Sequence, residues 1–151
     1  MRPRAPRYAM RALALLLLLA GCLDTIGPEV GPLQSARCVP DDSDPGTSLS
    51  YRLDIATIFA TRCFNCHSPS GPTPIGLEIG GLNLTSYASL RAGGTQSGAD
   101  IVIPGDPCRS ILYQKLGPGP PFGSRMPLNG ILSDAALQKV HDWIAEGALD
   151  N

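Results

Sequence analysis

The apolar residues of this 151-residue chain recur at the spacing of short helices. From Leu53 onward they share one helix face, and Asp54 lies near the start of the stretch. This pattern predicts an amphipathic helix that runs into Cys63. Residues 87–91 predict one or two further helical turns, and no internal repeat is present.

Two more helices are predicted in the second half of the chain. Asp106 followed by Pro107 favours a helix start, because Asp caps free N–H groups and Pro is tolerated at the first helical position. This helix would end at Gly117. The last helix would begin at Ser133 and end at Gly147. Its apolar stripe comprises Ala136, Leu137, Val140, Trp143 and Ile144.

Long loops rich in Gly and Pro separate the predicted helices, above all over residues 68–83 and 117–121. The chain holds 17 Gly and 15 Pro, whereas aromatic residues make up only 5%. A large aromatic core is therefore excluded. Loops of this length are unusual in a compact domain. They indicate an all-α fold of three or four short helices that wraps a bulky ligand.

Residues 1–21 have the pattern of a secretory signal peptide. Four Arg and no acid accompany the apolar run 12–20, which is too short to span a bilayer. The run ends in Leu-Ala-Gly-Cys22, which resembles the cleavage box of bacterial lipoproteins. The resemblance implies cleavage before Cys22 and lipidation of that residue; an ordinary secretory signal is the alternative. It further implies an exported protein anchored on the periplasmic side of a bacterial membrane, and Leu23 in place of Asp favours the outer membrane.

Residues 22–52 are predicted to be a flexible tether behind the lipidated Cys22, because Gly-Pro pairs and clustered Asp replace apolar periodicity. The folded domain would then span residues 53–151. The whole chain has a net charge of −1, and removal of the signal segment with its four Arg leaves −5. This balance excludes a basic nucleic-acid-binding surface. It would steer a basic protein partner toward the domain.

The segment Cys63-Phe64-Asn65-Cys66-His67 is a C-x-x-C-H motif, the attachment pattern of c-type haem. Two Cys at this spacing near a helix end can reach the two vinyl groups of one porphyrin. The adjacent His67 would then lie under the iron as an axial ligand. Three other interpretations are a thiol–disulfide redox centre, a structural disulfide and a zinc site. A closed zinc site would need a fourth ligand from a carboxylate, Cys38, Cys108 or His141.

Met126 is the one Met outside the signal segment, and it lies in a Gly/Pro-rich loop just before the last helix. In a chain with a haem motif we interpret it as the distal iron ligand. Thioether ligation favours the reduced iron and raises the potential. His141 falls to the side of the last helix's apolar stripe and is predicted to face solvent, with bis-histidine ligation as the alternative.

In their order along the chain these features resemble class I mono-haem cytochrome c domains, over about residues 53–149. The shared pieces are Ile58-Phe59, the CFNCH motif, Pro104–Pro107 with Leu112–Leu116, Met126-Pro127 and the closing helix with Trp143. The resemblance implies a cytochrome c-like fold with long loops around one covalently attached haem c per chain. Cys63 and Cys66 would form the thioether bonds, with His67 and Met126 as iron ligands. Phe59 and Trp143 would meet beside the haem.

One departure from the family pattern concerns the support of His67. Many members have a Gly-Pro some dozen residues after the His, and its Pro carbonyl orients the imidazole. Here Gly71-Pro72 follows only five residues after His67. The sequence therefore assigns no hydrogen-bond partner to the His67 ring.

Cys38 and Cys108 remain once lipid and haem account for the other three of the five Cys. In an oxidising compartment a disulfide is the default for two such thiols. It would tie the tether to the start of the third helix. Two free thiols, or a bond to another chain, are the alternatives.

These expectations favour an electron-transfer protein rather than an enzyme. A membrane-anchored c-type cytochrome would pass single electrons between a redox-protein donor and a redox-protein acceptor. A haem-based small-ligand sensor or peroxidase-like protein is the first alternative, and it requires Met126 to be displaceable. A non-haem thiol or zinc protein is the second.

Overall fold

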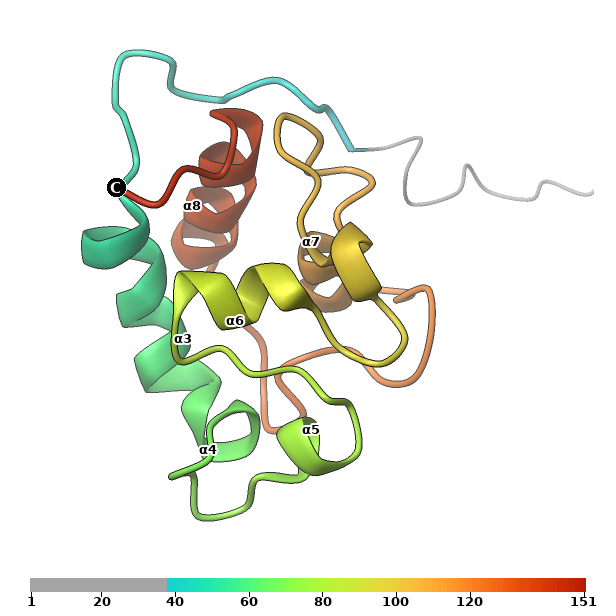
Figure 1. Ribbon diagram of the computed structural model, residues 1–151. Helices are drawn as coiled ribbons and strands as arrows, with labels where there is room; N and C mark the ends of the chain where they lie inside the picture. The colour runs from blue at the N-terminus through green and yellow to red at the C-terminus, as the bar shows by residue number, and fades with distance from the viewer. Residues whose placement is uncertain (1–37) are drawn as a thin grey trace, which may run out of the picture. The chain divides into compact units, whose positions relative to one another are not determined.

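The computed structural model describes residues 38–151, and this part of the chain is helical without any strand (Figure 1). The all-α prediction is confirmed. The helices, in chain order, are η1 (Tyr51–Ile55), α3 (Ala56–Arg62), α4 (Phe64–His67), α5 (Ile75–Glu78), α6 (Tyr87–Ala92), η2 (Gly98–Ile101), α7 (Ile111–Leu116) and α8 (Asp134–Ala145). The signal segment 1–21, Cys22 and the tether up to residue 37 lie outside the described residues.

The π-helical turn η1 and helix α3 follow each other directly and form the predicted first helix. It begins at Tyr51, where the Ser50 hydroxyl accepts the N–H of Leu53 at 3.3 Å. At its other end the N–H of Cys63 donates to the Phe59 carbonyl at 2.8 Å. The single turn α4 starts at the next residue, so the C-x-x-C-H motif lies at the end of a helical segment, as expected.

Helix α5 lies inside residues 68–83, which the sequence predicts to be a loop. Gly76 lowers the intrinsic helix propensity of this segment. The turn is nevertheless closed, because the Ile79 N–H donates to the Ile75 carbonyl at 2.9 Å. In Figure 1 α5 lies beside α4 at one end of the domain. Packing against α4 therefore outweighs the weak local preference.

Helix α7 begins at Ile111 rather than at Asp106, so the predicted start is wrong. Asp106 does cap a turn, since its carboxylate accepts the N–H of Arg109 at 3.0 Å. The fully buried Ser110 then closes that turn: its hydroxyl donates to the Asp106 carbonyl at 2.8 Å and accepts the N–H of Ile103 at 2.8 Å. The α-helix starts only after this turn, and it ends before Gly117 as predicted.

Helix α8 follows its prediction. The Ser133 side chain accepts the N–H of Ala136 at 3.3 Å, and Gly147 follows the helix with a φ of +103°. None of the helices in residues 38–151 is long and apolar enough to cross a membrane.

Aromatic rings link the first and last helices. Phe59 and Trp143 are both fully buried, and the ring of Tyr51 lies against each, with centroids 6.5 Å and 5.7 Å away. The ring of Tyr87 also packs against Tyr51, with centroids 5.3 Å apart. Tyr51 therefore lies between Phe59 and Trp143, the two residues that the family resemblance places together. The sequence did not predict this role for Tyr51.

Residues 38–50 differ from the flexible tether expected for this stretch. They run to the start of the first helix, where the chain's C-terminus also lies (Figure 1). The Ser43 hydroxyl donates to the Asp142 carboxylate at 2.6 Å, and the Leu49 N–H donates to the Glu146 carboxylate at 2.8 Å. We call residues 38–50 the N-terminal strap. Hydrogen bonds of polar side chains and of the main chain hold the strap in place. Such contacts need no regular pattern of apolar residues, so the sequence did not indicate them.

Candidate haem-binding site

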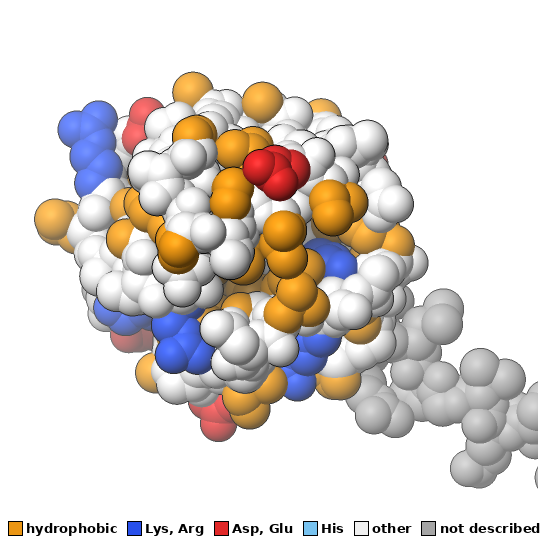
Figure 2. Space-filling model, turned by 90° about the horizontal axis from the view of Figure 1, so that it is seen from below, with side chains coloured by type: hydrophobic (Ala, Val, Ile, Leu, Met, Phe, Trp, Pro, Cys, Tyr) orange, Lys and Arg blue, Asp and Glu red, His pale blue; other side chains and the backbone are white. Residues whose placement is uncertain are grey.

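A cavity of about 440 Å³ opens between α3, α4, α5 and α7 and the loop that precedes α8. Four of the predicted site residues line it: Cys63, Cys66, His67 and Met126. Figure 2 views the domain from the end at which α4 and α5 lie, and hydrophobic side chains surround a hollow on this face. The volume and the mostly apolar lining are those of a small-molecule or cofactor site.

His67 ends helix α4, and the rest of the fold fixes its ring. Its Nδ1 lies 3.1 Å from the Leu82 carbonyl oxygen. Because a carbonyl only accepts, Nδ1 carries the proton and Nε2 keeps a free lone pair for a metal. The Leu84 N–H donates to the His67 carbonyl at 2.9 Å, which holds the two segments together. Leu82 thus provides the support that the sequence left unassigned.

The environment of His67 favours the neutral form of its imidazole, which is the form that can bind a metal. Burial lowers its pKa below the ordinary value, and the positive charge of Lys115 acts in the same direction, against the hydrogen bond to Leu82. Gly76 of α5 lies directly against the ring. A Cβ at position 76 would stand 2.5 Å from Cε1 and 2.6 Å from Nε2. Only a residue without a side chain fits there.

The two thiols of the motif are free and partly buried. Burial raises the pKa of Cys63 to about 11, with Cys66 adding to the rise and Arg62 opposing it. A reactive redox thiol has a lowered pKa. The Cys63 environment is therefore that of an unactivated thiol, which does not fit a thiol–disulfide redox centre.

Met126 reaches the same cavity from the loop between α7 and α8. Its N–H donates to the Lys115 carbonyl at 2.7 Å, which fixes the main chain next to the thioether side chain. The Arg125 side chain donates to the Leu116 carbonyl at 2.7 Å. The cavity thus receives two candidate iron ligands, His67 and Met126, from parts of the chain that are distant in sequence.

The chemistry of the lining fits a haem c group. Two thiols and an imidazole lie on one short helical turn, and a thioether comes from a separate loop. The charged residues in the lining are Arg62 and Lys115, both positive, and none is acidic. This suits a porphyrin, whose edge carries carboxylates. Exposed apolar residues, Ile75, Ile79 and Leu128, also contribute to the lining.

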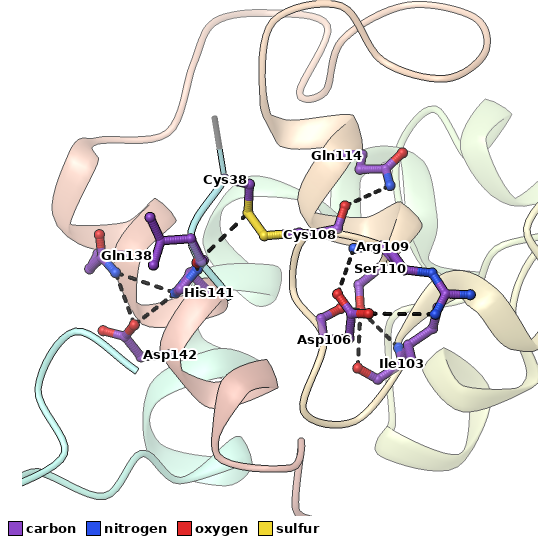
Figure 3. Close-up of a disulfide and its surroundings, with 11 residues drawn as sticks. Cys38, Ile103, Asp106, Cys108, Arg109, Ser110, Gln114, Gln138, His141 and Asp142 are labelled. Atoms are coloured by element: carbon purple, nitrogen blue, oxygen red, sulfur yellow. Dashed lines mark hydrogen bonds and ion pairs between the residues drawn. A yellow bond between two sulfur atoms is a disulfide. The ribbon is translucent and has the colours of Figure 1, made fainter. Parts of the chain in front are cut away.

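His141 is buried, so the prediction that it faces solvent is wrong. It is 5% exposed because the strap covers this side of α8. Its Nε2 donates to the Val39 carbonyl at 2.7 Å and its Nδ1 lies 2.8 Å from the Asp142 carboxylate (Figure 3). Both ring nitrogens of His141 therefore contact groups that do not line the cavity. His141 is not placed to serve as a second histidine ligand.

Cys38 and Cys108 form a disulfide that joins the strap to the turn before α7 (Figure 3). Neither they nor His141 come to the Cys63–Cys66 pair as zinc ligands. Across residues 38–151, no group of three or more His, Cys, Asp or Glu side chains is placed to hold a metal ion. The zinc interpretation therefore lacks its ligand set.

Comparison with known families agrees with this site. Residues 63–127 match the family model described as Planctomycete cytochrome C. The matched segment begins at Cys63 and ends at Pro127, directly after Met126, so it contains all four of the predicted site residues that line the cavity. The match supports a cytochrome c domain, and with it a c-type cytochrome that binds haem covalently. No curated protein and no solved structure matches the chain.

Proposed function

We propose that this protein carries single electrons through one covalently bound haem c with His67 and Met126 as its axial iron ligands. The observation that carries the proposal is the shared cavity, which His67 and Met126 both line. When bound, the haem supplies an iron that alternates between two oxidation states. If His67 and Met126 both bind the iron, it would have no free position for a substrate, which favours electron transfer over catalysis.

The chain's own residues perform three tasks in this proposal. Cys63 and Cys66 would hold the porphyrin covalently, so that it is not lost from a protein exported out of the cell interior. The Leu82 carbonyl orients the His67 imidazole and keeps its Nε2 unprotonated. The apolar lining excludes water from the iron and, with the thioether of Met126, favours the reduced state.

The opening of the cavity also indicates where redox-protein partners would bind. Electrons would enter and leave where the cavity opens, past exposed apolar side chains such as Ile79 and Leu128. A redox-protein donor and acceptor would dock there in turn. We further propose that a lipid on Cys22 holds the protein on the periplasmic side of a bacterial membrane, with Leu23 favouring the outer one.

The decisive experiment uses protein matured together with a c-type haem attachment system. Wild type and Met126→Ala are compared by haem staining after denaturing electrophoresis and by carbon monoxide binding to the reduced protein. We expect covalent haem in both and carbon monoxide binding only in the variant, because alanine leaves the sixth position open. Ile131→Ala, an exposed apolar residue outside this cavity, is the control and should behave as wild type.

Two results would contradict the proposal. If wild type binds carbon monoxide as well as Met126→Ala does, the iron has an open site, and a sensor or peroxidase-like protein is the better description. If no haem is attached to wild type, the Cys pair has another role.

A further inference from the structure

Lys115, near the C-terminal end of α7, contacts the loop before Met126 through both its main chain and its side chain. Its carbonyl accepts the N–H of Met126 at 2.7 Å. Its Nζ donates to the Phe122 carbonyl at 2.6 Å and to the Ser124 carbonyl at 2.5 Å. The ammonium also lies 4.9 Å from the centroid of the Phe122 ring. One residue therefore holds the loop at three positions, Phe122, Ser124 and Met126.

The ammonium group of Lys115 is partly withdrawn from water. It lines the cavity, and burial lowers its pKa. Within residues 38–151 it forms no ion pair with a carboxylate. Two of its three N–H groups donate to loop carbonyls. Hydrogen bonds from a charged donor are stronger than those from a neutral donor. The charge is thus used to fix the main chain that carries Met126.

A simpler role would be to neutralise the C-terminal end of α7, as Lys does in many last helical turns. The acceptors argue against this, because both belong to the loop and neither is a carbonyl of α7. Arg125 binds the helix end instead, through the Leu116 carbonyl. Lys115 on the helix thus donates to carbonyls of the loop, and Arg125 on the loop donates to a carbonyl of the helix.

We propose that Lys115 is a positioning residue that keeps Met126 in place as the distal iron ligand. This inference rests on the proposed ligation by His67 and Met126. The hydrogen bonds of Lys115, together with the one from Arg125 to the Leu116 carbonyl, hold this Gly/Pro-rich loop to α7. Loss of the ammonium would remove two of the hydrogen bonds that hold the loop to α7, and the bond from Met126 to iron would open more often.

The test substitution is Lys115→Met, which keeps an unbranched stem and removes the three donors. In the matured, reduced protein we expect carbon monoxide to bind roughly 10- to 100-fold more tightly than to wild type, as loss of a charged hydrogen bond predicts. The reduction potential should also fall, because weaker thioether ligation stabilises the reduced iron less. A purely structural role would move neither quantity. Lys139→Met is the matched control: it removes the chain's only other Lys, which pairs with Asp54.

Lys115→Arg and Lys115→Gln complete the series. Arg keeps the charge and several donors, so we expect partial recovery of carbon monoxide exclusion. Gln keeps a neutral donor and should fall between Arg and Met. If Met and Gln both exclude carbon monoxide as wild type does, the positioning role is refuted. Loss of haem from both would make Lys115 a folding residue and would equally refute it.

The proposed ligation fails in a distinguishable way. In that case wild type and Met126→Ala already bind carbon monoxide alike, before any change at Lys115 is considered.

Discussion

At His67, neighbours from two other segments decide what the imidazole can do. The Leu82 carbonyl sets the tautomer, and Gly76 leaves space against the ring. Neither contact is visible in the C-x-x-C-H motif, because one partner is a backbone atom and the other is the absence of a side chain. The motif supplies the candidate ligand, and its neighbours determine the orientation and protonation of the imidazole.

Gly76→Ala is the sharpest test at this scale. The added Cβ would lie within 2.8 Å of three ring atoms of His67, so the ring or α5 must shift. Overpacking of this kind costs about 1–3 kcal/mol. We expect lower haem attachment and an altered absorption spectrum. Gly46→Ala is the control, since its Cβ would have a single neighbour at 3.5 Å. Identical haem content and spectra in the two variants would show that the ring tolerates the methyl group.

At the scale of elements, the strap and α8 act as one unit around Asp142. The Asp142 carboxylate accepts bonds from the Ser43 main chain and hydroxyl and from Gln138, and it lies against His141. Burial acts to raise the pKa of Asp142, but these hydrogen bonds outweigh it and lower the pKa below its ordinary value of 3.8. The carboxylate is therefore a charged anchor for the strap.

This anchor predicts a loss of stability in acid. A lowered pKa in the folded state stabilises the fold fully above the unfolded value of about 3.8, and the contribution is lost as the pH falls through the lower folded value. Asp142→Asn should lower the free energy of unfolding at pH 7 by about 2 kcal/mol and reduce its fall on acidification. Urea unfolding of the holoprotein at several pH values measures both. Asp41→Asn, an exposed strap residue, is the control; equal curves for the two variants would rule the anchor out.

At the scale of the whole molecule, the domain places its functions on different segments. The cavity lies between α3, α4, α5 and α7, while the strap binds α8 and is tied by the Cys38–Cys108 disulfide to the turn before α7. The chain before Cys38 is therefore attached to the folded domain at two places, the strap and, through the disulfide, the turn before α7. The residues that carry the proposed lipid lie outside the described part of the chain.

Cys22→Ser tests the anchor directly. A lipidated protein stays with the membrane fraction, whereas the variant should be released into the soluble fraction, because acyl chains supply the membrane affinity. Cell fractionation with haem staining measures the distribution. Leu23→Ala keeps the lipidated residue and should remain with the membranes. A Cys22→Ser protein that stays bound would mean that something other than this lipid holds it.

The sequence by itself determined the features that depend on local spacing. The C-x-x-C-H motif, the all-α pattern and the cap and end of α8 each need only a few neighbouring residues. Tertiary structure alone decided the Leu82 support of His67, the burial of His141 under the strap and the late start of α7, after Ser110. The reason is physical: these features are hydrogen bonds made largely by main-chain groups or polar side chains. Such contacts are set by proximity in the fold and leave no periodic signal along the chain.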